Sequence, residues 1–417
     1  MINPLVREWS APNIPPLGLL QLSSVLRQNG HEVKIMDING HRWSMDVVEK
    51  QIAKDEEYDI YGLGGLVTTY SYNMWLADII KMDHPGKIRI CGGPLTTAKS
   101  DILLKHVNSV IIGEGEEAIL DVVQDVERSR LKGIYQSDKP MLLDSLPQPD
   151  YDNLDTLPVY LNAAVGAHNP RKWLDGKSIR QVKTLPILSG RGCPFNCGFC
   201  SSHYLGPGFR FRSVSNIVKE AKGLIERYGV KYLHFCDELT VPSRGRCLDL
   251  CSELAKMDVT WGCPVRIDLL GYELLSEMRD AGCIHVGTGI ESFSPKVLKS
   301  MGKSLNPDLA KTLLKQAHNL MDIQYTLILG YIGETKETLN ETIRGVKEIG
   351  FPPEQVFFPV PYPGTQLYGY ARSYGFIEDE EKHLEALSNH EQRDLLFNFS
   401  SLSDEELLDA RNRIMET

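Results

Sequence analysis

The chain has 417 residues, of which 42% are hydrophobic and 24% charged, and its formal net charge is −10 at pH 7. This composition is typical of a globular protein of about two or three domains and excludes a disordered, collagen-like or coiled-coil chain. Net acidity argues against a nucleic-acid binder. No apolar run approaches the roughly 18 residues that span a bilayer, and no signal peptide is recognisable, so we expect a cytoplasmic protein.

Residues 1–130 alternate predicted helices and strands. A helix is expected from Leu17 to about Gly30. Strands are predicted at 2–3, 32–37, 59–63, 87–91 and 109–112. Strands that alternate with helices pair in parallel, so this part is expected to be a doubly wound, Rossmann-like α/β domain.

Glycine-rich turns follow the last three of these strands. Glycine lets the backbone approach a large ligand closely, and doubly wound sheets bind ligands at the carboxyl ends of their strands. The candidate binding residues in these turns are Gly65, Gly92, Gly93, Gly113, Glu114 and Gly115. The alternative, ordinary turn chemistry after a strand, stays open.

Residues 131–184 show no clear alternation and are punctuated by prolines and aspartates, so a linker is predicted. A second alternation covers residues 185–373, with strands expected at 186–189, 232–236, 260–265, 285–289, 324–329 and 355–359. Six such units predict a partial (β/α)6 barrel with functional residues at the carboxyl ends of its strands. Residues 374–417 are expected to form a helical C-terminal region, with Ser403 as an N-cap.

The strongest functional signal is a CxxxCxxC motif formed by Cys193, Cys197 and Cys200, directly after the first strand of the second part. The nine cysteines are an odd number in a chain without an export signal, which favours reduced thiols over disulfides. Three thiolates in one loop favour an iron–sulfur cluster or zinc. A structural zinc site would need a fourth ligand, for which His203 is the nearest candidate.

With Phe199 before its last cysteine, this motif resembles that of the radical S-adenosylmethionine (SAM) superfamily. The resemblance implies a [4Fe–4S] cluster whose open iron binds SAM, reductive cleavage of SAM to a 5′-deoxyadenosyl radical, and an electron donor such as flavodoxin or ferredoxin. Segments 287–292 and 329–335 resemble segments that follow the family's fourth and fifth strands. By the same resemblance, SAM is contacted by Asp237 or Glu238, Arg266, Glu291 and the backbone near Gly330.

Residues 1–130 resemble the cobalamin-binding domain of a subgroup of this superfamily, through segments 15–20, 92–94 and 113–117. The resemblance implies cobalamin at the glycine-rich turns. The DxHxxG motif of other cobalamin proteins is absent, so cobalamin binding stays open. If cobalamin is bound, the implied reaction is methylation of an unactivated carbon or phosphorus of a small-molecule substrate.

The leading hypothesis is therefore a cobalamin-dependent radical SAM methyltransferase. The nearest alternative is a radical SAM enzyme that rearranges, cyclises or cleaves a carbon skeleton, with or without cobalamin. A non-catalytic iron–sulfur or zinc protein is the alternative from a different class. The sequence singles out no substrate and no catalytic residue besides the cofactor-binding ones. Aromatic candidates for lining a substrate pocket are Tyr204, Phe209, Tyr325 and Tyr362.

Overall fold

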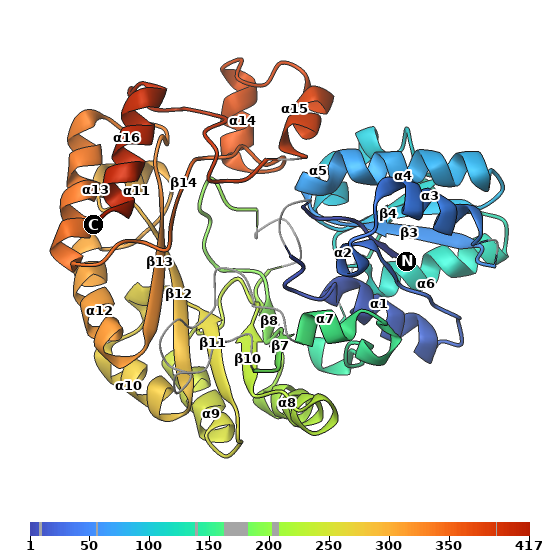
Figure 1. Ribbon diagram of the computed structural model, residues 1–417, viewed down its shortest axis with the longest axis horizontal. Coiled ribbons are helices and arrows are strands. Elements are labelled where there is room, and N and C mark those ends of the chain that lie inside the picture. The colour runs from blue at the N-terminus through green and yellow to red at the C-terminus, as the bar shows by residue number, and fades with distance from the viewer. Residues whose placement is uncertain (8–10, 56, 138–140, 162–181, 202–207, 389) are drawn as a thin grey trace. The chain divides into compact units, whose positions relative to one another are not determined.

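The computed structural model describes residues 1–417 except 8–10, 56, 138–140, 162–181, 202–207 and 389 (Figure 1). The described chain divides into two compact units, and each is discontinuous in sequence. The first unit contains Met1–Tyr160 and Arg372–His390, and the second contains 182–201, Gly208–Ala371 and Glu391–Thr417. No helix in the described ranges is long and apolar enough to cross a membrane.

The first unit is built on a parallel sheet of six strands in the order β2-β1-β3-β4-β5-β6. The strands are β1 (Ile2–Asn3), β2 (Met36–Asp37), β3 (Ile60–Gly64), β4 (Ile88–Gly92), β5 (Ser109–Ile112) and β6 (Ile134–Gln136). The order of strands reverses between β1 and β3, which is the kind of position where doubly wound sheets bind ligands. The predicted doubly wound fold is confirmed.

Amphipathic helices cover this sheet. They are α1 (Leu17–Gln28), α2 (Ile38–His41), α3 (Met45–Ala53), α4 (Tyr70–Asp83), α5 (Pro94–Leu103), α6 (Gly115–Glu127) and α7 (Leu157–Leu161). On one face, Leu26 of α1 and Val122 of α6 pack with Ile90, Ile111 and Tyr135 of the strands in one buried cluster. Removing this apolar surface from water stabilises the unit.

Two details of this sheet differ from the prediction. Strand β2 contains only Met36 and Asp37, although a strand over 32–37 was expected. Strand β6 lies in the segment predicted to be a linker, where it pairs in parallel with β5. Only the central residue of β6, Tyr135, is buried, so its three residues carry too little alternation to reveal a strand.

A helix from far along the chain completes the first unit. Helix α15 (Glu380–Leu387) packs against α4 and the turn that precedes it. Leu384 and Leu387 are fully buried. Lys99 lies 2.5 Å from Glu380, and the Ser71 and Ser388 hydroxyls are 2.9 Å apart. Residues 374–417 are therefore divided between the two units.

The second unit contains a curved parallel sheet in the order β14-β13-β12-β11-β10-β7. These strands are β7 (Thr184–Ile187), β10 (Tyr232–Phe235), β11 (Thr260–Pro264), β12 (Cys283–Glu291), β13 (Asp322–Ile328) and β14 (Gln355–Phe357). Each strand neighbours the next one in the chain, as in a (β/α) barrel, and the sheet stays open between β7 and β14. The predicted partial (β/α)6 barrel is confirmed. A short antiparallel pair, β8 (Gly190–Arg191) and β9 (Arg210–Phe211), follows β7.

Helices line one side of this curved sheet (Figure 1). They are α8 (Val214–Tyr228), α9 (Arg244–Leu254), α10 (Tyr272–Asp280), α11 (Pro295–Ser300), α12 (Pro307–Leu320) and α13 (Lys336–Ile349), and α14 (Gln366–Ser373) and α16 (Asp404–Met415) follow them. In α13, Leu339, Ile343 and Val346 form a buried stripe at helical spacing. Ser403 caps α16 with Glu406 in a capping box, as predicted.

Candidate active site

The loop that carries the three cysteines begins at the carboxyl end of β7, as predicted. Cys193, Cys197 and Cys200 form no disulfide and are partly exposed. The Gly198 N–H donates to the Met301 carbonyl at 2.8 Å, and the Gly198 carbonyl accepts from the Leu367 N–H at 2.9 Å. The loop is therefore fixed on both sides by backbone contacts from segments far away in the sequence.

Asp237, which follows β10, supports the start of this loop. Its carboxylate accepts hydrogen bonds from the Ser189 N–H and hydroxyl, both at 2.6 Å, and from the Gly190 N–H at 3.0 Å. Burial raises the pKa of Asp237, while these hydrogen bonds oppose the shift. Because three donors already occupy this carboxylate, its geometry favours a structural task over contact with a ligand.

The neighbouring carboxylate, Glu238, is exposed and faces the cysteine loop. Its Oε2 accepts a hydrogen bond from the Gly192 N–H at 3.2 Å. Gly192 has φ of +82°, and a Cβ there would lie 2.6 Å from the Gly208 carbonyl oxygen, so glycine is required. Of the two acidic residues predicted to reach SAM, Glu238 is the one with an accessible carboxylate.

Arg266 follows β11 and contacts the cysteine loop directly. Its guanidinium lies 3.8 Å from the centre of the Phe195 ring, in cation–π geometry. It also donates to both carboxylate oxygens of Asp268, at 3.0 and 2.7 Å, and to the Ser304 carbonyl at 2.5 Å. Arg266 therefore braces the loop between Cys193 and Cys197.

Glu291 lies at the carboxyl end of β12, and 7% of its surface is exposed. Its Oε1 forms an ion pair of 2.8 Å with the Lys303 ammonium group, which also donates to the Gly289 carbonyl at 2.7 Å. Glu291 has φ of +70°, a region that non-glycine residues rarely adopt. Sequence reasoning missed Lys303, because it lies in a turn after α11 that matches no motif.

Gly330 follows β13 and has φ of +89°. Its N–H donates to Oε2 of Glu334 at 2.5 Å, and its carbonyl accepts from the Phe399 N–H at 2.9 Å. Glu334 is fully buried, and Oε1 of Glu334 has no hydrogen-bond partner among the described residues. Burial raises the pKa of Glu334 to about 7. This buried carboxyl group holds the turn that was predicted to flank SAM.

A cavity of about 190 Å³ opens beside these groups in the second unit. Phe199 and Glu291 contribute to its wall, and so does Tyr362, one of the predicted aromatic candidates. The remaining lining residues are Thr326, Ile328, Phe357, Phe358, Pro359, Val360 and Gln392. The residues from β14 and the turn after it were missed, because they carry no motif.

Two other aromatic candidates, Tyr325 and Phe209, are not among the residues that line this cavity. Tyr325 is fully buried, and its hydroxyl donates to the Phe351 carbonyl at 2.9 Å, so it belongs to the hydrophobic core. Phe209 packs edge-on against Phe211, with ring centres 4.3 Å apart. Tyr204 and the proposed zinc ligand His203 lie outside the described residues.

The cysteine loop fits an iron–sulfur cluster. Burial has the largest effect and raises the pKa of both the Cys193 and the Cys197 thiol. The positive charge of Arg266 partly opposes this rise at both thiols, and that of Lys303 does so at Cys197. These cations favour the thiolate form that binds metal. Within the described ranges, no three His, Cys, Asp or Glu side chains converge to hold a single metal ion. A cubic cluster does not require such convergence, because each thiolate binds a different iron.

Besides Cys236, which directly follows β10, the barrel contains four further cysteines outside this loop. Cys247 and Cys251 are on α9, with sulfur atoms 4.0 Å apart, and Cys263 and Cys283 are in β11 and β12. All four are buried and free. They therefore behave as small core residues.

In the first unit, the predicted glycine-rich turns meet at the carboxyl edge of the sheet. A Cβ on Gly93 would lie 3.1 Å from the Gly65 carbonyl oxygen, so the turns after β3 and β4 touch. Gly115 packs against α1, and Glu114 precedes α6 as its N-cap. At Gly92 and Gly113, a Cβ would have no atom of the described part of the chain within 4 Å. This open edge fits a large planar ligand such as a corrin.

Two threonines of α5 hold these turns together. The Thr96 hydroxyl donates to the Gly93 carbonyl at 2.6 Å and to the Ile111 carbonyl at 2.8 Å. The Thr97 hydroxyl accepts from the Gly113 N–H at 3.0 Å. Sequence reasoning did not single out either residue, because threonine in a first helical turn is common.

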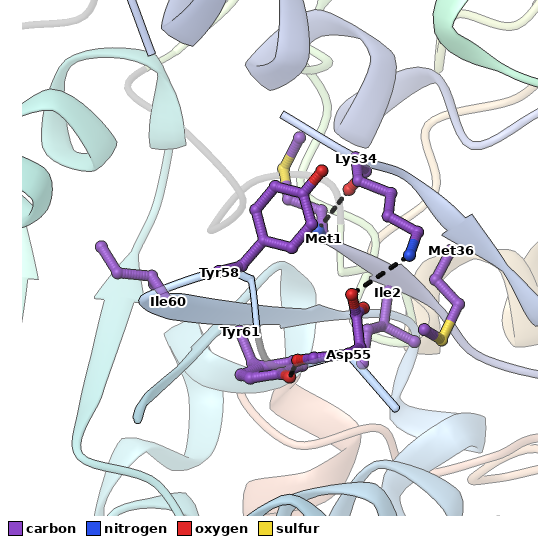
Figure 2. Close-up of a pocket in the computed structure, with 8 residues that line it drawn as sticks. All are labelled: Met1, Ile2, Lys34, Met36, Asp55, Tyr58, Ile60 and Tyr61. Carbon is purple, nitrogen blue, oxygen red and sulfur yellow. Dashed lines mark hydrogen bonds and ion pairs between the residues drawn. The ribbon is translucent and has the colours of Figure 1, made fainter. Parts of the chain in front are cut away.

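A further pocket, in the first unit, lies at the amino end of β3, near Ile60. Its volume is about 20 Å³, enough for roughly one water molecule. Figure 2 shows the Met1 ammonium group donating to the Lys34 carbonyl and the Lys34 side chain paired with Asp55. This pocket is too small for a cofactor and lies at the wrong end of the strands, so it is not a candidate site.

Comparison with known proteins agrees with this geometry. The Radical SAM superfamily matches residues 187–346, and the B12 binding domain matches residues 6–123. An uncharacterized methyltransferase of Pyrococcus horikoshii is 28% identical, over 86% of this chain and 78% of that protein. The anaerobic magnesium-protoporphyrin IX monomethyl ester cyclase of Rubrivivax gelatinosus is 27% identical, over 86% of this chain and 66% of that protein.

Among solved structures, the radical S-adenosylmethionine methyltransferase TsrM from Kitasatospora setae, solved with cobalamin and a [4Fe–4S] cluster bound, aligns with a TM-score of 0.67. The alignment covers 88% of this chain and 73% of TsrM at 15% identity, so it shows a common fold.

Together, the partial barrel with its three-cysteine loop and the doubly wound unit define a radical SAM enzyme with a B12-binding domain. The chain therefore contains both a radical SAM domain and a B12-binding domain. Its cofactors are a [4Fe–4S] cluster, SAM and cobalamin.

Proposed function

We propose that the chain is a cobalamin-dependent radical SAM methyltransferase that methylates an unactivated carbon or phosphorus of a small molecule. The observation that carries this proposal is that one chain contains two candidate cofactor sites: the three-cysteine loop beside the Glu291–Lys303 pair, and an open glycine-rich edge in a B12-binding unit. The similarity to a methyltransferase over 86% of the chain supports it.

When bound, the cluster with SAM supplies a carbon radical that removes a hydrogen atom from the substrate, and cobalamin supplies a methyl group. Cys193, Cys197 and Cys200 hold the cluster, and Arg266 braces their loop. Glu291 binds the ribose of SAM. The cavity that Phe199 helps to line takes the adenine, a flat aromatic ring that packs against aromatic and aliphatic side chains.

Glu238 is proposed for the methionyl end of SAM, and Gly330 for the turn that flanks the adenine. Glu238 contacts the SAM amino group, since its carboxylate is exposed beside the cysteine loop. The turn at Gly330, held by Glu334, closes the adenine side. The glycine-rich turns of the first unit hold the corrin, through Gly92 and Gly113 in particular.

The cluster needs an electron from outside the chain. We assign this task to a small redox protein such as flavodoxin or ferredoxin. A thiolate-ligated cluster and nine cysteines that form no disulfide suit the reducing cytoplasm, where we place the reaction.

The experiment separates the two cofactor sites. The full chain, reconstituted anaerobically, is incubated with SAM and dithionite, with and without hydroxocobalamin. We expect 5′-deoxyadenosine in both reactions and S-adenosylhomocysteine only with hydroxocobalamin. The Cys193→Ala/Cys197→Ala/Cys200→Ala variant should lose 5′-deoxyadenosine. If the wild type released none, or if hydroxocobalamin did not bind, the proposal would fail.

The second candidate function is cyclisation or another carbon-skeleton reaction. The similarity to the magnesium-protoporphyrin ester cyclase favours it. Such an enzyme would release 5′-deoxyadenosine without cobalamin-dependent S-adenosylhomocysteine, so the same experiment distinguishes the two functions.

A further inference from the structure

Strand β12 is interrupted next to the proposed SAM site. Gly289 pairs with Thr326 of β13, whereas Glu291 pairs with Leu327, so β12 uses two residues where β13 uses one. This is a β-bulge, and it ends in Glu291 with φ of +70°. A glutamate in this backbone region is strained, so surrounding contacts must stabilise it.

Lys303 supplies these contacts from both sides of the bulge. Its ammonium group lies 2.7 Å from the Gly289 carbonyl oxygen before the bulge and 2.8 Å from the Glu291 carboxylate after it. A Cβ on Gly289 would lie 2.1 Å from Oε1 of Glu291, so the carboxylate folds back over this glycine. Because Lys303 and Glu291 are 8% and 7% exposed, water competes little with this ion pair.

The turn that carries Lys303 also touches the cysteine loop. Gly302, two residues after the end of α11, has φ of +67°. Its N–H donates to the Lys299 carbonyl, and the Lys303 N–H donates to the Leu298 carbonyl, so these bonds close the end of the helix. Met301 accepts the Gly198 N–H of the cysteine loop at 2.8 Å. One rigid helix end therefore contacts both the cysteine loop and the bulge.

We infer that Lys303 is a positioning residue that holds Glu291 in its strained backbone and aims its carboxylate at the SAM ribose. The inference rests on the proposed SAM site and is independent of methyl transfer. It requires Lys303 to act through Glu291 and not by its own contact with SAM. The two single variants and the double variant must then weaken SAM binding to the same extent.

The test measures SAM affinity by anaerobic equilibrium dialysis on the reconstituted full chain. Lys303→Met and Glu291→Gln should each weaken SAM binding about tenfold, since each breaks a buried charge-assisted contact. The double variant should also lose about tenfold, and Lys303→Arg should recover most of the affinity. Iron content should match wild type, and the spectral response of the reduced cluster to SAM should weaken.

The matched control is Lys299→Met, which removes an exposed lysine from the same helix end and should bind SAM like wild type. Additive losses in the double variant would show that Lys303 contacts SAM itself and would overturn the inference. It would also fail if Lys303→Met lost its iron while Glu291→Gln kept it, since Lys303 would then serve the cysteine loop. If wild type with a full cluster bound no SAM, the proposed function would fail together with it.

Discussion

Arg266 stacks on Phe195, a residue inside the cysteine loop, at 3.8 Å from the ring centre, while its Nε and Nη2 donate to the Asp268 carboxylate. The cysteine loop is thus braced by the residue that follows β11, two strands further along the barrel sheet than β7. The cation also favours the thiolate form of Cys193 and Cys197. Cluster binding should therefore depend on a residue that does not ligate iron.

Arg266→Met should lower the iron content after reconstitution and speed iron loss to a chelator. The physical reason is the loss of a cation–π contact of about 1–2 kcal/mol and of the positive charge near the thiolates. Iron per chain, measured over time with chelator, checks this. Arg279→Met, on the exposed side of α10, is the control and should keep wild-type iron. Equal retention by both variants would contradict the bracing role.

Each of the three motif cysteines should be needed for the cluster. Replacing Cys200 by serine should reduce iron from about four per chain to a small fraction, because a [4Fe–4S] cluster depends on its thiolates. Iron analysis and visible absorbance measure the effect. Cys251→Ala, which replaces a buried cysteine of α9, should keep full iron. A lower iron content in this variant would point to a second cluster site.

Gly92→Val should abolish or strongly weaken hydroxocobalamin binding without unfolding the protein. A Cβ on Gly92 would have no atom of the described residues within 4 Å, so the added side chain should enter the space at the sheet edge. Binding followed by absorbance titration, with the melting temperature alongside, tests this. Gly86→Val is the matched control, since Gly86 is equally open but precedes β4 and lies at the other edge. If Gly92→Val bound cobalamin as tightly as wild type, the corrin would have to bind at another place than the turn at Gly92.

Glu334 should make stability depend on pH. Its pKa is about 7 in the folded protein and 4.5 in the unfolded chain, so the folded state binds more protons between these values. The free energy of unfolding therefore falls as pH rises from about 4.5 to 7, by on the order of 3 kcal/mol. Glu334→Gln, which keeps an acceptor for the Gly330 N–H, should remove this slope.

Urea unfolding of wild type and Glu334→Gln at several pH values measures the difference. Glu277→Gln, on the exposed side of α10, should leave the pH dependence as in wild type. Parallel curves for wild type and Glu334→Gln would mean that Glu334 is already ionised in the folded protein at low pH.

Leu384→Ala should destabilise the first unit by about 2–5 kcal/mol, because it leaves a cavity at a fully buried position between α15 and the rest of the unit. Faster amide hydrogen exchange in α4 (Tyr70–Asp83) would report the effect. Lys382→Ala, on the exposed side of α15, should exchange like wild type. Faster exchange confined to the second unit would contradict the division of the chain.

Patterns local in sequence predicted both folds. Alternating helices and strands identified ten of the twelve strands of the two large sheets within about one or two residues, and the motif placed Cys193, Cys197 and Cys200 after the first barrel strand. Strand β6 was missed and β2 was overextended, because two or three residues carry little periodicity.

Contacts distant in sequence were the part that could not be predicted. By resemblance, Asp237 or Glu238 and also Arg266 were expected to reach SAM. No pattern in the sequence indicated that Asp237 is hydrogen-bonded to Ser189 or Arg266 to Ser304. Lys303 reaches Glu291 only because α11 turns back on the bulge, and no spacing rule indicates this. The wall of the cavity after β14 likewise depends on how the chain folds over it, because its residues form no motif.

The division of the chain has a consequence for biosynthesis. The first unit needs α15, which the ribosome makes only after every strand of the barrel. Until α15 emerges, the nascent first unit exposes the part of α4 that Leu384 and Leu387 later cover, and such apolar surface invites aggregation. Because both units are discontinuous in sequence, truncating the chain at one position gives neither unit complete. An isolated cobalamin-binding fragment must therefore have residues 372–390 joined to it.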